Sequence, residues 1–260
     1  MSGCWDPIPF LDERPTQRCL GAVERAIEEM DGYRPRGMFV EQEESDATKI
    51  HAVILGPPGT PYEGGFFHFL IKCPTFYPLS PPRVRFMTTD AGRVRFGPNF
   101  YENGKVCLGL LGTWTGPSWT TRHSIASLLL SIRSLLNENP ISSGQAFGVL
   151  PAVGTWCNDS ICYNAVLRHE TIRVAVCDAV EACLLDTSPL PPALRDIVLK
   201  HFSQLYAKYE ESVKQQLHLT GACMNDAFEG GVAVYQYATL RERLRDLRDM
   251  VMTRNEAAAG

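Results

Sequence analysis

The chain has 260 residues, 45% hydrophobic and 21% charged, with a net charge of −4. This is typical of one large packed domain, or of one domain with an extension. No basic cluster is sustained enough to indicate a nucleic-acid partner. No stretch approaches the roughly 18 apolar residues of a membrane span, so we expect no membrane partner. We also find no signal-peptide pattern at the start.

The nine cysteines are odd in number and scattered, and none forms a C-x-x-C pair. This pattern disfavours a zinc ribbon or a thioredoxin-like site, so we expect no metal. The simplest interpretation is a set of free thiols in a reducing compartment. Most of them should be packed in the core.

The chain begins with an arm, residues 1–15, which carries three prolines and no period. From Thr16 a helix is predicted, because apolar residues recur at steps of three and four until Gly32. Four short runs rich in β-branched and aromatic residues follow, each bounded by a turn: residues 37–42, 48–56, 64–73 and 82–88. Short connections favour antiparallel pairing, so we predict a four-stranded meander with a helix on one face.

Residues 90–121 have no clear period, and a loop of this length in a compact domain tends to be functional. An apolar stripe then predicts a strong helix over residues 125–136. Residues 141–159 are expected to be a loop. The rest is predicted to be helical, with Leu240, Leu244, Leu247 and Val251 on one face of the last helix and a frayed end at residues 255–260. The fold class is therefore α+β.

Cys107 poses the main question of function. Its apolar neighbours predict a buried, inert thiol. The turn pair Asn103-Gly104 beside it instead suggests a loop that exposes the thiol as a nucleophile. The residues alone leave both possibilities open. Together with the motif around Cys107, they lead us to expect that the apolar neighbours hold the segment to the core while the glycine and asparagine turns expose the thiol.

Three stretches form a specific pattern: "YPLSPPRVRF", "GPNFYENGKVCLGLL" and "SIASLLLSIRSLLNENP", with Trp114 and Trp119 between the last two. Their order and spacing resemble the catalytic core of ubiquitin-conjugating enzymes. The resemblance implies a core with an N-terminal helix, a four-stranded antiparallel meander, a long active-site loop and a central helix.

Further matches resemble the Z-type subgroup of this family: "WDPIPF", "PYEGGFF", "FYENGKVCLGLLGTWTGPSW" and "RHETIRVAVC". That subgroup carries an all-helical C-terminal extension. The resemblance implies an N-terminal arm (residues 1–15), a catalytic core (16–175) and the extension (176–260).

The resemblance also implies the chemistry. Cys107 would accept ubiquitin, or a ubiquitin-like modifier, as a thioester from an activating enzyme and pass it to a substrate lysine, usually with a ligase. Asn99 matches the asparagine that supports the oxyanion or the loop. No cofactor is expected, since the activating enzyme consumes the ATP. The Z-type pattern implies the noncanonical activating enzyme. We expect the protein in the cytoplasm and nucleus.

Partner surfaces follow from the same resemblance. Leu79, with Pro78 and Pro81 beside it, matches the loop that meets the ligase, although the prolines could simply stiffen a connection. The chain departs from the family in three places. Gly97 replaces a bracing histidine, Ser142 falls where an acidic residue prepares the lysine, leaving Glu138 as a candidate, and residues 120–122 read Thr-Thr-Arg in a ligase-contacting loop.

Two other functions compete with the enzyme. The first is a catalytically weak variant that binds ubiquitin as an interaction module. The second is a thiol hydrolase that pairs Cys107 with a histidine, for which His123 is the nearest C-terminal candidate.

Overall fold

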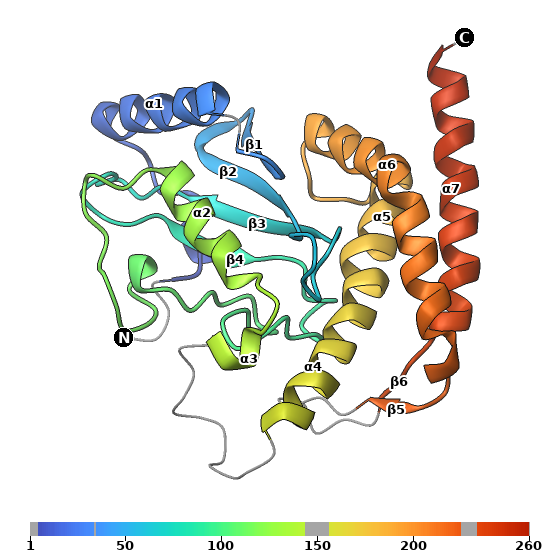
Figure 1. Cartoon of the computed structure of the whole chain (residues 1–260). Helices are drawn as coiled ribbons and strands as arrows, with labels where there is room; N and C mark the ends of the chain where they lie inside the picture. Colours follow the sequence, from blue (N-terminus) through green and yellow to red (C-terminus); the bar gives the residue numbers. More distant parts are fainter. Residues whose placement is uncertain (1–4, 34, 144–155, 225–232, 260) are drawn as a thin grey trace. The chain divides into compact units, whose positions relative to one another are not determined.

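A computed structural model of the chain (Figure 1) describes residues 5–33, 35–143, 156–224 and 233–259. The chain divides into two compact units. The first comprises Met1–Pro57 and Phe67–Leu150, and the second comprises Pro58–Phe66 and Pro151–Gly260.

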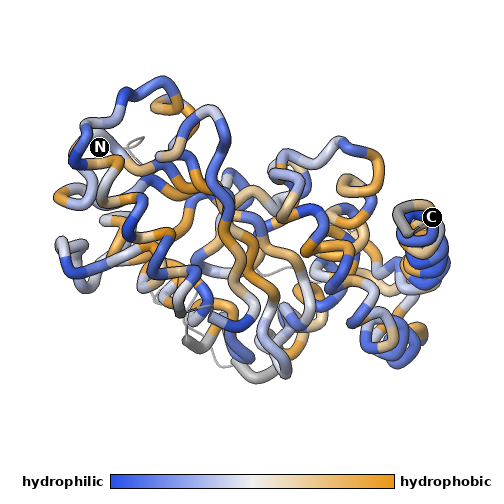
Figure 2. The backbone as a smooth tube through the Cα atoms, turned by 90° about the horizontal axis from the view of Figure 1, so that it is seen from above, coloured by the Kyte–Doolittle hydropathy of each residue, from blue (hydrophilic) through white to orange (hydrophobic). Residues whose placement is uncertain are grey.

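A four-stranded sheet forms the centre of the first unit. Its strands follow one another in the order β1-β2-β3-β4, with β1 antiparallel to β2 and β3 antiparallel to β4. The strands are β1 Met38–Glu43, β2 Asp46–Leu55, β3 Phe66–Lys72 and β4 Arg83–Phe86. Every residue of β3 is buried, and Figure 2 shows hydrophobic stretches along the sheet. The predicted meander is confirmed.

Helices cover this sheet as the sequence predicts. Helix α1 (Gln17–Tyr33) packs against β2 and against α2 (Ile125–Leu135). The Ser124 and Ser127 side chains form a capping box at the start of α2, which satisfies free N–H groups of its first turn. Two 3₁₀ turns and a short helix complete the unit: η1 Ile8–Phe10, η2 Gly109–Leu111 and α3 Pro140–Ser143. The loop expected over 141–159 is therefore wrong at its start, since α3 occupies 140–143.

The N-terminal arm is tied to the edge strand β4. Glu13 pairs with Arg83 at 2.5 Å, and Asp6 pairs with Arg85 at 2.5 Å. The Phe10 ring centre lies 3.8 Å from the guanidinium carbon of Arg83. Charge pairing and cation–π contact therefore hold a segment that has no periodic pattern of its own.

A buried lysine connects the arm to the sheet. The side chain of Lys72, at the end of β3, is 1% exposed. Its ammonium group donates to the Leu11 carbonyl at 3.1 Å and forms an ion pair with Asp46 at the start of β2. A buried ammonium group is tolerated only where such partners replace water.

The second unit is mainly helical. Its first helical run passes from α4 (Trp156–Glu170) through the π-helical segment η3 (Thr171–Asp178) into α5 (Ala179–Leu184). The boundary that we expect between the catalytic core and the C-terminal extension, at residues 175 and 176, falls inside η3. The division of function at that boundary stays a prediction. The start of α4 at Trp156 also shortens the loop expected up to residue 159.

Two long helices pack together after this run, α6 (Pro192–Gln216) and α7 (Tyr237–Ala259). Between them lie η4 Leu217–Leu219 and the short strands β5 Cys223–Met224 and β6 Ala233–Val234. The four apolar residues predicted to line one face of α7 are all buried, while Figure 2 shows the helix as mostly hydrophilic. Fraying from residue 255 is wrong, because α7 continues to Ala259. No helix in the described ranges is both long and apolar enough to cross a bilayer.

The segment Pro58–Phe66, which ends on the first residue of β3, belongs to the second unit and contacts α6. The Tyr209 hydroxyl donates to the Gly64 carbonyl at 2.8 Å, and Lys208 lies 3.7 Å from Glu63. Gly64 has φ +76°, and a Cβ there would come within 2.7 Å of the Tyr209 ring. Only glycine allows this close approach.

Candidate active site

Cys107 follows a tight turn between β4 and α2. The Gly104 N–H donates to the Tyr101 carbonyl at 3.0 Å, and the Tyr101 N–H donates to the Lys105 carbonyl at 3.0 Å. Gly104 has φ +90°, in the region that favours glycine. The Asn103 side chain accepts the Lys105 N–H at 3.0 Å. The turn predicted from the Asn-Gly pair is thus confirmed.

Asn99 and Cys107 are locked to each other. The Asn99 amide donates to the Cys107 carbonyl at 2.9 Å, and the Cys107 N–H donates to the Asn99 carbonyl at 2.9 Å. Asn99 is buried. The structure thus brings the two predicted site residues together, with the amide group committed to holding the loop.

Thr113 holds the segment on both sides of Cys107. Its hydroxyl donates to the Val106 carbonyl at 2.6 Å and accepts the Leu108 N–H at 2.9 Å. Sequence reasoning missed this residue. A single threonine six positions after a cysteine carries no motif, and its role depends on the chain turning back through η2.

Arg95 braces the loop at Gly97, the position where the resemblance leads us to expect a histidine. Its guanidinium donates to the Gly97 and Pro98 carbonyls, each at 3.0 Å. Gly97 has φ +122°, which a histidine would adopt only with strain. Glycine therefore suits this loop geometry, which Arg95 stabilises through the two carbonyls. Arg95 also went unnoticed in the sequence.

The thiol itself is covered, so the expectation that the turn exposes it is wrong. Cys107 is 2% exposed. Burial raises the pKa of the Cys107 thiol, while the positive charge of Lys105 and a hydrogen bond from the Tyr101 hydroxyl act in the opposite direction, with a smaller contribution from Arg95. The apolar run draws the whole segment inward, and Tyr101, a third residue missed in the sequence, is among the groups that lower the pKa of the thiol.

The described residues give the thiol no histidine partner. The groups that act on it are Lys105, Tyr101 and Arg95. His123 accepts the Thr120 N–H through Nδ1 at 2.9 Å, and its ring lies 5.5 Å from that of Trp119. A hydrolase needs a base such as imidazole to activate its thiol. A thiol without one is better suited to exchange with a thioester than to hydrolysis.

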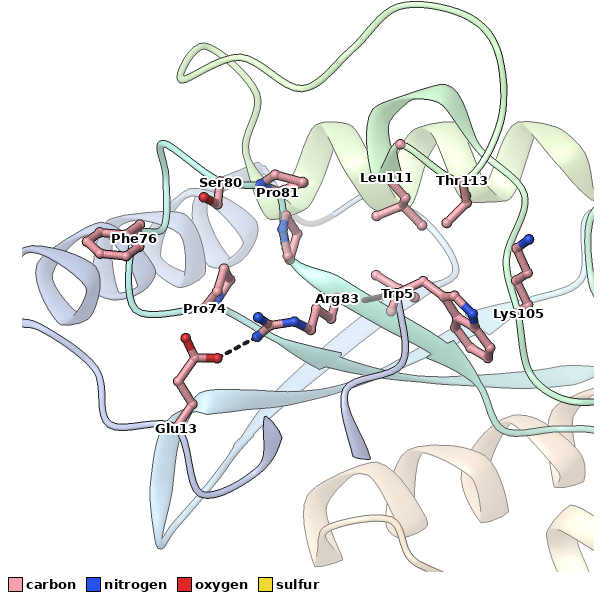
Figure 3. A pocket seen from close by; sticks show the side chains of 13 residues that line it. Trp5, Glu13, Pro74, Phe76, Ser80, Pro81, Arg83, Lys105, Leu111 and Thr113 are labelled. Atoms are coloured by element: carbon pink, nitrogen blue, oxygen red, sulfur yellow. Dashed lines mark hydrogen bonds and ion pairs between the residues drawn. The ribbon is translucent and has the colours of Figure 1, made fainter. Parts of the chain in front are cut away.

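The predicted partner-binding loop lies near the same segment. Leu79 is 56% exposed, as a docking side chain would be. The Trp119 indole donates to the Pro78 carbonyl at 2.9 Å, so Trp119 anchors its own loop to this segment. Pro81 lines a groove of about 580 Å³ whose wall also includes Lys105. Figure 3 shows this groove with its Glu13–Arg83 ion pair.

The remaining predicted site residues are less informative. Glu138 is exposed, as are residues 120–122. The side chain of Ser142 lies outside what the structure describes. Among the described residues, no group of three or more His, Cys, Asp or Glu side chains is arranged to hold a metal ion.

Comparison with known proteins gives one consistent result. Residues 22–171 match the sequence profile of the ubiquitin-conjugating enzyme family. The chain is 47% identical to "Ubiquitin-conjugating enzyme E2 Z" of Homo sapiens over 253 residues, which covers 96% of this chain and 69% of the relative. It is 45% identical to the protein of that name from Xenopus tropicalis, over 96% of this chain and 78% of the relative.

A more distant relative is "Probable ubiquitin-conjugating enzyme protein 17" of Caenorhabditis elegans, at 34% identity over 65% of this chain and 24% of the relative. The resemblance to the family and to its Z-type members is thereby confirmed, as is the predicted α+β fold. The chain belongs to the ubiquitin-conjugating enzyme family and is a transferase that forms thioester intermediates in ubiquitin conjugation.

Proposed function

We propose that Cys107 is the residue that carries the modifier. The observation that supports this most is its reciprocal hydrogen bonding with Asn99, inside the segment that resembles the family's catalytic motif. No other described cysteine has such a setting. Cys19, Cys73, Cys177 and Cys183 are buried elsewhere, and Cys162 and Cys223 are exposed.

The chemistry consists of two acyl transfers. The Cys107 thiolate attacks the thioester carbonyl on the activating enzyme, a new C–S bond forms, and the thiolate of the activating enzyme leaves. A substrate lysine amine then attacks the Cys107 thioester, an isopeptide bond forms, and the Cys107 thiolate leaves while the amine loses a proton. A thiolate serves both steps because it is a good nucleophile and a good leaving group.

Asn99 supports these steps by fixing the loop that carries Cys107. Its amide bonds to the Cys107 carbonyl, so loop support is the role that the contacts favour. The same amide lies close in the chain to Cys107, where amine attack on the thioester would produce the oxyanion. To donate a hydrogen bond to that oxyanion as well, the amide would have to release the Cys107 carbonyl during amine attack.

The proposed partners are ubiquitin, the noncanonical activating enzyme, a ligase and protein substrates, with a ubiquitin-like modifier as a second cargo. The similarity to relatives named E2 Z supports the choice of activating enzyme. Leu79, Pro78 and Pro81 form the proposed ligase contact, supported by the exposure of Leu79. No nucleic acid or membrane partner is proposed.

The enzyme is proposed to need no cofactor of its own, with ATP consumed by the activating enzyme. We place it in the cytoplasm and nucleus, where a reducing environment keeps a nucleophilic thiol free. Discharge of purified thioester to free lysine in EDTA, without ATP, tests the first point. Loss of discharge in EDTA would contradict it. Imaging of the tagged chain tests the second.

The first experiment is charging with ATP, ubiquitin and each kind of activating enzyme, followed by non-reducing gels. We expect a band shift that dithiothreitol removes and that Cys107→Ala abolishes. Cys162→Ala, at an exposed cysteine, is the matched control and should charge normally. Charging of Cys107→Ala would refute the assignment. The absence of charging by either activating enzyme would favour the alternative of a ubiquitin-binding module.

A second experiment addresses the ligase contact. Leu79→Ala should leave charging intact and reduce ligase-stimulated discharge, because an exposed apolar side chain contributes to binding and little to folding. Ile161→Ala, which removes a similarly exposed side chain at 63% exposure in the second unit, should change neither step. Equal discharge by the two variants would exclude Leu79 from the contact.

A further inference from the structure

The groove of about 580 Å³ described above borders the segment that carries Cys107. Its volume lies within the range of about 300–1,000 Å³ that is typical of ligand pockets. All of its lining belongs to the first unit. Lys105 and Thr113 are part of this lining, and the Thr113 hydroxyl bonds to the residues on both sides of Cys107. One end of the groove therefore lies next to the segment that would hold a thioester.

The lining of the groove is mostly apolar and includes an exposed aromatic ring. Phe76, Pro81 and Leu111 are among these residues. Phe76 is 67% exposed, far more than a phenylalanine of the core. Figure 3 shows Phe76 and Lys105 at opposite ends of the groove. Such a surface suits an extended polypeptide segment that brings an apolar side chain to one end and a charged one to the other.

The charges within the groove do not cancel. Glu13 and Arg83 both line it, and they pair with each other at 2.5 Å. Lys105 is the third charged residue of the lining, and the described part of the chain gives it no carboxylate partner. Its ammonium group lies 5.9 Å from the centre of the Tyr101 ring, near the outer limit of a cation–π contact. The groove thus has an excess of one positive charge, and this charge lies two residues from Cys107.

The position of this charge favours one class of occupant. In the second acyl transfer the acceptor is a lysine of a polypeptide, and the residues beside that lysine must pass close to Cys107. A carboxylate among them would be attracted to Lys105 while the lysine amine reaches the thioester. The modifier is a poorer match, because its terminal carboxyl group is consumed in the thioester and no longer carries a charge.

We propose that the groove binds the substrate segment next to the acceptor lysine and that Lys105 selects segments with Asp or Glu beside that lysine. Lys105 is then a specificity-determining residue of the enzyme. The proposal rests on the proposed function of Cys107. It adds to that function a sequence preference at the acceptor step, which the two acyl transfers do not themselves require.

Discharge of the purified thioester of the full chain to synthetic peptides tests the proposal. The peptides share one sequence with a single lysine, flanked by Asp, Asn or Arg. The Asp peptide should react about three to five times faster than the Asn peptide, which is the effect of one partly exposed ion pair. The Arg peptide should be the slowest, and added salt should reduce these differences.

Three variants separate Lys105 from other causes. Lys105→Glu should reverse the order of the peptides, and Lys105→Arg should keep it. Lys200→Glu changes the net charge equally at an exposed position of α6 and should leave the order unchanged. If Lys105→Glu does not fold, Lys105→Gln should abolish the preference.

The measured quantity is the ratio of rates for two peptides within one variant. Lys105 also acts on the thiol through its charge, so absolute rates will differ between variants, and the ratio cancels that difference. The same ratio in Lys105→Glu as in the wild type would overturn the proposal. Charging and discharge slowed equally for all peptides would assign the groove to the modifier instead. An unchanged ratio with a loss of ligase stimulation would assign it to the ligase.

Titration of the Asp and Arg peptides into the uncharged chain tests the groove without a thioester. NMR shifts of the Lys105 and Thr113 amides should respond to the Asp peptide at lower concentration than to the Arg peptide, and Lys105→Glu should remove this difference. Such shifts together with a failure of charging would count against the proposed function alone. Normal charging without any peptide preference would count against the groove alone.

Discussion

Asn99 and Cys107 bond to each other twice, once through the Asn99 amide and once through the Cys107 N–H, both at 2.9 Å. The two residues are thus fixed as one unit, although eight positions separate them. The asparagine beside the candidate nucleophile therefore has a structural task before any acyl group arrives.

Asn99→Ala removes the amide donor and should slow both acyl-transfer steps. The loss of one hydrogen bond weakens the loop by about 1 kcal/mol. If the amide also serves the oxyanion, discharge to lysine should fall by a further factor of about 10². Single-turnover charging and discharge measure the two steps separately. Asn103→Ala, which also removes one side-chain hydrogen bond from the segment between Asn99 and Cys107, is the control. An Asn99 variant with normal charging would show that the amide has no structural task.

Thr113→Val should loosen the segment around Cys107, since valine has the shape of threonine but lacks its hydroxyl. Two hydrogen bonds, to Val106 and from Leu108, are lost, at about 1 kcal/mol each. Faster hydrogen exchange at the Leu108 amide and slower charging are the expected results. Thr113→Ser keeps the hydroxyl and should behave like the wild type. Unchanged exchange in the valine variant would contradict the role given to Thr113.

Gly64→Ala should destabilise the second unit far more than Gly59→Ala. Both glycines have nearly the same positive φ, +76° and +77°, but only at Gly64 does a Cβ meet another group, the ring of Tyr209. Backbone strain costs about 1 kcal/mol in each variant, and overpacking adds about 2 kcal/mol at Gly64. Urea unfolding measures both. Equal losses would mean that Tyr209 moves aside freely.

Glu170 should make the second unit lose stability in acid. Burial raises its pKa, but hydrogen bonds from His169 at 2.7 Å and Arg173 at 2.9 Å outweigh burial, so the folded pKa lies below the ordinary 4.5. A lowered pKa means that the carboxylate favours the fold. Its contribution is complete above pH 4.5 and is lost as the pH falls through the folded pKa.

Melting temperatures at neutral pH and near pH 4 check this expectation. Glu170→Gln should be less stable than the wild type at neutral pH, and the difference should shrink in acid. Glu242→Gln, at an exposed position of α7, controls for the change of net charge. A Glu170→Gln deficit that is the same at both pH values would rule out the carboxylate as its source.

The strands and main helices follow from the sequence because their patterns are local. The β-branched and aromatic runs of β1 to β4 and the apolar stripe of α7 are set by neighbours within a few positions, so local composition and period place them. The capping serines of α2 and the turn at Asn103-Gly104 also depend on adjacent residues. The attachment of the arm and of the segment Pro58–Phe66 depends on distant partners, so no local pattern predicts how these segments are held.

The site divides in the same way. Cys107 and Asn99 lie in a motif that the sequence displays. Tyr101, Arg95 and Thr113 act through geometry that arises only when the loop closes on itself, so their roles could not be seen in the order of residues. The exposure of the thiol was predicted wrongly because a turn signal fixes where the chain reverses and leaves open which side chain then covers it.

The attachment of the arm bears on where this protein can be cut. The family match begins at residue 22, so a fragment chosen by that boundary would lack Glu13, Asp6 and the Leu11 carbonyl. Arg83 and Arg85 would lose their ion-pair partners, and Lys72 would keep only Asp46 in a buried position. A shortened protein would then show a weakened edge strand next to Lys105 and the thiol. A loss of activity after removal of the arm would therefore reflect the lost contacts of β4 and Lys72. It would not show that the arm binds a partner.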